Sequence, residues 1–185
     1  MDQSSPPVHK LFTYGTLMNI PILERVLGRT VDDLKFMPAI LLNHSRLKLL
    51  DADYPAAVPV STAKSILGRG LTAEESEVHG RLIIGLTPTD LLRLDRFEGE
   101  GERYNSMILS VTVIDESQDN SISSNDEQTI LGDNVEASVY IYSDGLRSNL
   151  APVFWTHEEF SKNHLLKWTQ DQLAEFDIFE ERREI

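Results

Sequence analysis

One carboxylate, Glu98, occupies a position from which it could transfer protons. Leucines between Pro88 and Glu98 are spaced as in an amphipathic helix, which places Leu91 and Leu94 on the face that carries Glu98. Apolar surroundings disfavour the charged form of a carboxyl group, so its pKa rises from about 4.3 toward neutrality, where it can accept a proton and return it. The same periodicity fits a Glu98 that ends a frayed helix and bends into solvent beside Gly99.

A glycine turn follows the first apolar run of the chain. Lys10 to Tyr14 is apolar and aromatic and stops at Gly15, which predicts a strand that enters a turn. Glycine tolerates positive φ, and here it could expose consecutive backbone N–H groups as a small site for an anion such as a carboxylate. An ordinary strand-ending turn is the alternative, and the pair Gly15–Thr16 alone does not decide between them.

Other common kinds of site find no support in the sequence. The five histidines show no i, i+4 pair and no H-E-x-x-H motif, so we expect no metal site. Neither G-x-G-x-x-G nor G-K-[ST] is present for a nucleotide, and no G-x-S-x-G elbow is present for a serine nucleophile. The absence of cysteine excludes disulfides, thiolate nucleophiles and sulfur metal ligands.

The helix that carries Glu98 has marked ends. Thr87 can act as the N-cap, Pro88 suits the first helical position, and Asp90 stands at the third. Gly99 can end the helix. These signals predict a helix from Pro88 to Glu98 that follows a strand directly.

The remaining pattern predicts strands and helices in mixed order. Asp51 to Pro59 holds two prolines and is interpreted as a loop or an edge strand, while Ser61 to Ser76 stays ambiguous. The expected strands are Lys10–Tyr14, Ala39–Leu50, Val78–Leu86, Tyr104–Ile114 and Ala137–Tyr142, and the other expected helices are Pro21–Leu27 and one or two from Trp155 onward. This order predicts an α+β fold, a mixed sheet or small barrel with helices on its outside.

Length and local composition predict one domain. The chain has 185 residues, enough for one sizeable core and short for two. We expect a single domain over 8–185, with residues 1–7 disordered. The segment 115–136 has seven acidic residues and no basic one, which predicts a flexible loop joining two strands rather than a regulated, partner-binding segment.

The charge of the chain limits its partners. A formal net charge of −13 opposes nucleic acid and anionic membranes, and no basic patch is visible in the sequence. No stretch approaches the roughly 20 apolar residues of a membrane helix, and the N-terminus lacks signal-peptide features. We therefore expect a cytoplasmic protein that acts on a small molecule and binds neither nucleic acid nor membrane; its oligomeric state stays open.

Several segments together resemble a known family. They are Leu11-Phe12-Thr13-Tyr14-Gly15-Thr16-Leu17-Met18, Tyr54-Pro55-Ala56-Ala57-Val58-Pro59, Val78-His79-Gly80-Arg81-Leu82 and Leu94-Asp95-Arg96-Phe97-Glu98-Gly99. In the same order they are similar to the signatures of the γ-glutamylcyclotransferase-like superfamily, especially its avirulence-induced-gene-like branch. The resemblance extends from Phe12 to Tyr142.

The resemblance implies a fold, a reaction and a set of site residues. The fold is a small mixed barrel flanked by helices, and the reaction turns a γ-glutamyl group into 5-oxoproline and releases an amine, with no cofactor. The implied catalytic acid/base is Glu98. The residues implied to hold the substrate are Tyr14, Gly15, Thr16, Leu17 and Tyr104.

The sequence departs from the branch after Glu98. Many relatives have a Tyr followed two positions later by Arg or Lys, whereas Tyr104 here is followed by Asn105 and Ser106. Whether Arg103 replaces that basic residue stays open, and with it the identity of the substrate. Two other hypotheses remain: a cyclase, lyase or isomerase of the same fold that acts on another small metabolite, and a non-catalytic small-molecule-binding module.

Overall fold

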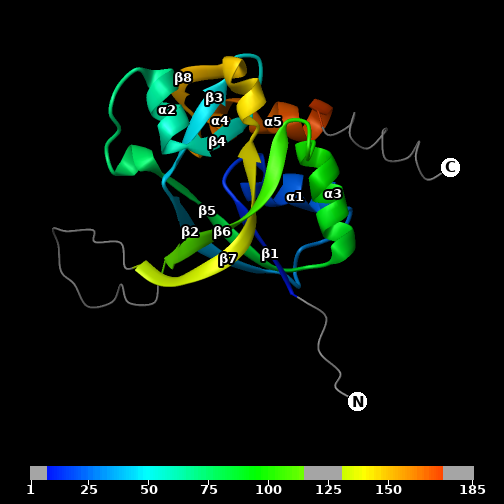
Figure 1. Ribbon diagram of the computed structural model, residues 1–185. Helices are drawn as coiled ribbons and strands as arrows, with labels where there is room; N and C mark the ends of the chain where they lie inside the picture. The colour runs from blue at the N-terminus through cyan, green and yellow to red at the C-terminus, as the bar shows by residue number, and fades with distance from the viewer. Residues whose placement is uncertain (1–7, 115–130, 173–185) are drawn as a thin grey trace, which may run out of the picture.

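A closed five-stranded barrel forms the centre of the protein (Figure 1). The computed structural model describes residues 8–114 and 131–172. The barrel strands are β1 (His9–Thr13), β2 (Lys35–Leu42), β5 (Glu77–Leu86), β6 (Tyr104–Ile114) and β7 (Leu131–Tyr142). Neighbours in the order β1-β5-β2-β6-β7 are antiparallel, and the parallel pair β1 and β7 closes the barrel. The expected α+β fold, a small mixed barrel flanked by helices, is confirmed.

The predicted strand Ala39–Leu50 is wrong, because it is two strands in two sheets. Asn43, at φ 60°, turns the chain out of the barrel after β2, and Asn is among the few residues that adopt this left-handed conformation readily. The chain then enters a three-stranded antiparallel sheet of order β4-β3-β8, made of β3 (His44–Leu49), β4 (Pro55–Pro59) and β8 (Leu150–Phe154). Strand β4 lies at an edge, as its prolines predicted.

Helices pack on the outside of the barrel and beside the second sheet (Figure 1). They are α1 (Ile20–Leu27), α2 (Val60–Leu67), α3 (Pro88–Glu98), α4 (His157–Asn163) and α5 (Leu165–Lys167), with short turns η1 (Thr16–Met18), η2 (Glu74–Ser76) and η4 (Asp144–Asn149) and the π-helical turn η5 (Trp168–Gln172). None of these described helices has the length and apolar character needed to cross a membrane.

Two hydrophobic clusters fill the two sides of the barrel wall. One takes alternate residues from all five barrel strands and fills the interior; it includes Phe12, Leu41, Leu82, Val111 and Val139. The other lies between the outer face of the wall, the second sheet and the helices; it includes Leu11, Ile22, Leu94, Phe160 and Trp168. Helix α3 is thus held against the wall by its apolar face.

The beginning and end of α3 follow from local hydrogen bonding. The Thr87 hydroxyl accepts from the Asp90 N–H at 3.1 Å, and the Asp90 carboxylate accepts from the Thr87 N–H at 2.8 Å, which forms a capping box. At the other end Gly99 adopts φ 66°, a conformation that few other residues would tolerate. Both predicted boundaries of this helix are confirmed.

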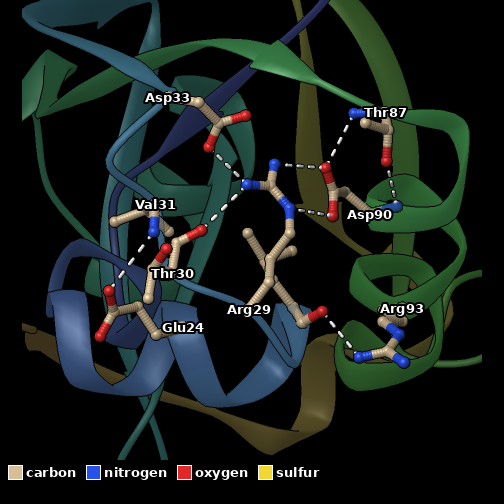
Figure 2. A network of polar contacts seen from close by, with 9 residues as sticks. Glu24, Arg29, Thr30, Val31, Asp33, Thr87, Asp90 and Arg93 are labelled. Atoms are coloured by element: carbon tan, nitrogen blue, oxygen red, sulfur yellow. Dashed lines mark hydrogen bonds and ion pairs between the residues drawn. The ribbon is translucent and has the colours of Figure 1, made fainter.

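An ion pair ties the start of α3 to the end of α1 (Figure 2). The Arg29 guanidinium donates two hydrogen bonds to the Asp90 carboxylate, at 3.0 and 2.8 Å. One turn further along α3, Arg93 donates to the carbonyl oxygen of Leu27 at 2.6 Å. The Asp90 side chain is only 3% exposed. This network therefore fixes the axis of the helix whose last residue is Glu98.

Replacing Asp90 by Asn is expected to lower the free energy of unfolding by about 1.5–3 kcal/mol at pH 7, because it removes a charge that accepts several hydrogen bonds. Burial opposes ionisation of Asp90, but the bonds from Arg29 and Thr87 outweigh it and lower its pKa. The carboxylate therefore stabilises the fold above the ordinary Asp pKa, and this contribution fades as the pH falls below about 4. Urea unfolding at pH 7 and pH 3.5 measures both effects.

Asp33 provides the control for this substitution. It also accepts from Arg29, at 2.5 Å, but its side chain is 64% exposed. Exposed ion pairs contribute at most about 1 kcal/mol, so Asp33→Asn should have a small effect. Equal losses from the two substitutions would show that the buried network does not stabilise the junction of α1 and α3.

The predicted loop 115–136 ends earlier than expected. Strand β7 already begins at Leu131, so the prediction is wrong for 131–136, where Ser110 pairs with Glu136 and Thr112 with Asn134. Polar residues can occupy this outer end of the hairpin because the β6 ladder satisfies their backbone groups. Residues 115–130 and the predicted disordered segment 1–7 lie outside the described residues.

Candidate functional site

One end of the barrel gathers the residues that the sequence singles out. Strands β1 and β7 are parallel, so their last residues, Thr13 and Tyr142, lie at the same end. Strand β6 runs the other way and begins there, with Tyr104 opposite Tyr142. Helix α3 leads into β6 through the short connection after Glu98. This topology brings the glycine turn after β1 to the end of the barrel where Glu98 and Tyr104 lie.

These segments line one pocket. Its lining residues are Phe12, Thr13, Tyr14, Gly15, Thr16, Leu17, Tyr54, Pro55, Glu98, Tyr104 and Tyr140. All six site residues expected from the sequence are therefore together. The free volume is about 20 Å³, room for one water molecule.

Glu98 is the ionisable residue of this pocket whose charge state can change near neutral pH. Its side chain borders the pocket instead of bending into open solvent, and Leu94 on the same helix face is fully buried. Burial raises the pKa of the Glu98 carboxyl to about 7, and the positive charge of Arg103 opposes this rise. At pH 7 both protonation states are consequently populated, as proton transfer in both directions requires.

Arg103 lies near Glu98 but is committed to other groups. Its guanidinium donates to the Tyr54 hydroxyl at 3.2 Å and to the carbonyl oxygen of Phe97 at 3.0 Å, and its charge centre lies 5.7 Å from the Tyr54 ring centre. It is not among the residues that line the pocket. Arg103 thus supports one wall of the pocket through Tyr54.

Three tyrosines build the remaining walls as neutral groups. The Tyr104 hydroxyl donates to the Pro55 carbonyl at 2.6 Å, the Tyr140 hydroxyl donates to the Asp95 carboxylate at 2.7 Å, and the Tyr14 hydroxyl donates to the Tyr140 carbonyl. Burial, with a further contribution from the nearby Glu98 charge, raises the pKa of Tyr14 and Tyr104 well above 10. They therefore remain protonated near neutral pH and are unsuited to act as bases.

Gly15 is required for a different reason from the one predicted. Its φ is −128°, so the expectation of positive φ is wrong. The space for a side chain is missing instead, because a Cβ atom at Gly15 would lie 2.8 Å from the Pro55 ring. After it the chain makes a tight turn in which the Met18 N–H donates to the Gly15 carbonyl at 3.0 Å. Close packing of the turn on β4 therefore sets this wall of the pocket.

Sequence reasoning missed part of the pocket. Tyr54 and Pro55 stand in one of the segments that carry the family resemblance, so a signal existed for them. Tyr140 gave no such signal, because its place in the pocket depends on the pairing of β7 with β1, more than 120 residues earlier. Within residues 8–114 and 131–172, no three His, Asp or Glu side chains converge as ligands for a metal ion.

Comparisons with known proteins agree with this architecture. Residues 11–162 match the family described as gamma-glutamyl cyclotransferase, AIG2-like. Protein AIG2 C of Arabidopsis thaliana is 27% identical over 118 residues, which are 64% of this chain and 61% of that protein. AIG2-like protein B of the same plant is 28% identical over 62% of this chain and 56% of its own length. The chain thus spans about three fifths of the length of these relatives.

Solved structures support the fold. A solution structure from Arabidopsis thaliana is similar with a TM-score of 0.53 at 22% identity, and the match covers 100% of this chain and 99% of the other. A second solution structure from the same plant has a TM-score of 0.52 at 22% identity, over 97% of this chain and 88% of the other.

Proposed function

Because the chain belongs to the γ-glutamyl cyclotransferase, AIG2-like family, we propose that it cyclises a γ-glutamyl group to 5-oxoproline with Glu98 as general acid/base. The observation that carries the proposal is the position of Glu98 in the pocket, where burial brings its pKa to about 7. The glycine turn, which lines the same pocket, offers backbone donors for a carboxylate. Both features match the roles that the family resemblance implies.

The reaction is an intramolecular acyl transfer. Glu98 takes a proton from the substrate's α-amine as that nitrogen attacks the γ-carbonyl carbon. The new carbon–nitrogen bond closes a five-membered ring, the bond to the leaving nitrogen breaks, and Glu98 returns its proton to that nitrogen. The products are 5-oxoproline and a free amine, and the residue ends in its starting state. This scheme requires no oxidant, metal or cofactor.

The pocket contributes mainly by positioning. Nucleophile and carbonyl belong to one molecule, and well-oriented intramolecular reactions reach effective molarities of about 10⁵–10⁸ M. In the proposal, the backbone of Gly15 to Leu17 binds the substrate carboxylate. Tyr104 contributes another part of the lining, since its hydroxyl is already bonded to the Pro55 carbonyl. A positioned base adds about 10²–10⁴-fold to the rate.

A panel of purified dipeptides and amides tests the proposal. The panel contains a γ-glutamyl amino acid, a γ-glutamyl amine and the matching α-glutamyl dipeptide, and 5-oxoproline is measured by mass spectrometry. We expect product from at least one γ-glutamyl compound and none from the α-glutamyl isomer, whose linkage places a different carbonyl at the reacting position. Failure of the purified protein to release 5-oxoproline from any γ-glutamyl compound would contradict the proposal.

The pH dependence of the rate follows from the raised pKa. The base is inactive when protonated, so kcat/KM should fall about tenfold per pH unit below pH 7 and level off above it. Initial rates between pH 5 and pH 8.5 measure this fall in kcat/KM, and circular dichroism at each pH checks that the protein stays folded. A rate that is constant from pH 5 to pH 8 would mean that Glu98 is not the base.

A further inference from the structure

A half-buried cation lies directly behind the glycine turn. Arg46, on β3, donates to the carbonyl oxygen of Tyr14 at 2.5 Å and to that of His79 at 3.2 Å. Its charge centre lies 4.9 Å from the ring centre of the buried Trp155. Within the described part of the chain, no Asp or Glu forms an ion pair with Arg46. Even half-burial of a guanidinium without a carboxylate partner is unfavourable, so the position of Arg46 needs an explanation.

A second cation flanks the same turn. Arg81, on β5, donates to the carbonyl oxygen of Met18 at 3.1 Å. The two arginines therefore bind the carbonyl that precedes the turn and the one that follows it. Burial and the charges of Arg46 and Arg81 lower the pKa of the neighbouring His157. In a chain with a formal net charge of −13, this is a local region of positive potential.

The bond from Arg46 acts on the peptide group that begins the turn. The carbonyl of Tyr14 and the N–H of Gly15 belong to one peptide unit, and that unit is trans because the described chain has no cis peptide. The N–H therefore points to the side opposite Arg46. A charged donor on the carbonyl polarises the whole unit and strengthens its N–H as a donor. By standard bond lengths, the Arg46 guanidinium and an anion bound to the Gly15 N–H would be only about 5–8 Å apart.

We propose that Arg46 is a positioning residue that orients the Tyr14–Gly15 peptide and supplies the counter-charge for a substrate carboxylate bound at Gly15 to Leu17. This inference rests on the proposed function and adds to it a side chain, Arg46, that recognises the α-carboxylate of the γ-glutamyl group from behind the turn. A purely structural contact with the Tyr14 carbonyl would require only a hydrogen-bond donor, charged or neutral. Only a cation also favours an anion on the other side of the peptide.

The test compares an acid with its neutral amide. Binding of 5-oxoproline and of its carboxamide is measured by calorimetry on the full chain for wild type, Arg46→Gln and Arg46→Lys. Arg46→Gln should weaken binding of the acid at least tenfold and of the amide less than threefold, whereas Arg46→Lys should keep the acid within about fivefold of wild type. In both variants kcat/KM should fall below the same pH as in wild type, since Glu98 is unchanged.

Arg69→Gln is the matched control. This substitution changes the net charge by the same amount as Arg46→Gln. Arg69 also lies over an aromatic ring, with its charge centre 6.0 Å from the ring centre of Phe154, but it is exposed and forms an ion pair with Glu75. Arg69→Gln should change the affinity for 5-oxoproline less than twofold. If Arg46→Gln does not fold, Arg46→Lys decides alone: a loss of acid binding above tenfold would overturn the role of charge.

The outcomes separate this inference from the proposed function. If Arg46→Gln weakens binding of the acid and of the amide equally, Arg46 is only a structural contact and the inference is wrong. A wild-type protein that does not bind 5-oxoproline would also overturn the inference. A different result would separate the two proposals: the wild-type protein binds 5-oxoproline with the predicted dependence on Arg46 but releases none from γ-glutamyl compounds. That result would refute the proposed reaction and still support the carboxylate site.

Discussion

Glu98→Gln is expected to lower kcat by about 10²–10⁴-fold while the protein remains folded. The amide keeps the shape and the hydrogen-bonding reach of the carboxyl group but cannot accept the proton. The pocket wall should therefore persist, and 5-oxoproline should bind within a few-fold of wild type. Single-turnover rates with an accepted γ-glutamyl substrate measure the chemical step directly.

The stability of the same variant distinguishes a catalytic from a structural Glu98. Because burial raises the pKa from 4.5 to about 7, ionisation destabilises the fold by an amount on the order of 3 kcal/mol above pH 7 and by nothing below the ordinary carboxyl pKa. Glu98→Gln should therefore melt close to wild type at pH 5 and several degrees higher at pH 8. A Glu98 held mainly by an ion pair would show the opposite sign.

Glu100→Gln is the control for both measurements. Glu100 lies two residues away, and its side chain is exposed and does not line the pocket. Its substitution should change neither kcat nor the pH dependence of the melting temperature. A Glu98→Gln protein that is folded and turns over near the wild-type rate would end the proposed mechanism.

Gly15→Val should weaken binding of 5-oxoproline by about 10²-fold, the second-largest effect expected. A Cβ at this position would lie 2.8 Å from Cγ and 3.0 Å from Cδ of Pro55, so the turn must move. Pro55 is itself buried in β4 and cannot retreat freely. A misplacement of about 1 Å can cost an enzyme about 10²-fold in rate, and we expect a loss of the same order in affinity here. Calorimetric titration measures the affinity, and thermal unfolding reports the accompanying strain.

Two further substitutions in the turn should weaken binding less than Gly15→Val does. Gly15→Ala makes the same first contact with Pro55 but adds no branches, so its loss should be intermediate. Thr16→Ser removes one methyl group from a buried residue and leaves the backbone in place, so it should have little effect on affinity. Small and equal effects from all three changes would exclude the turn as the carboxylate site.

The helix that carries Glu98 was predictable because its signals are local. Thr87, Pro88 and Asp90 specify its start through contacts three residues apart, and Gly99 ends it with a positive φ. The face that Glu98 shares with Leu94 then follows from helical periodicity alone. What periodicity could not decide was whether the last side chain turns inward, since that depends on Tyr14 and Tyr54 from other parts of the fold.

The parts that sequence reasoning missed depend on pairing between distant segments. Ala39 to Leu50 is rich in leucine with polar interruptions, and the polar run Asn43 to Arg46 does not by itself indicate that Asn43 divides the segment between two sheets. Arg46 lies in the second of these strands, and its contact with Tyr14 exists only once both sheets have formed. The polar start of β7 likewise forms strand because β6 provides a partner ladder.

Titration of the Glu98 carboxyl group is the most direct test of this account. Carbon-13 NMR of side-chain carboxyls in labelled protein, with the Glu98→Gln spectrum to assign the signal, follows its ionisation in the ligand-free protein. We expect a midpoint near pH 7, because the pocket removes the carboxylate from water and Arg103 offsets only part of that effect. A midpoint near the ordinary value of about 4.3 would contradict the claim that Glu98 is a base poised for proton transfer at neutral pH.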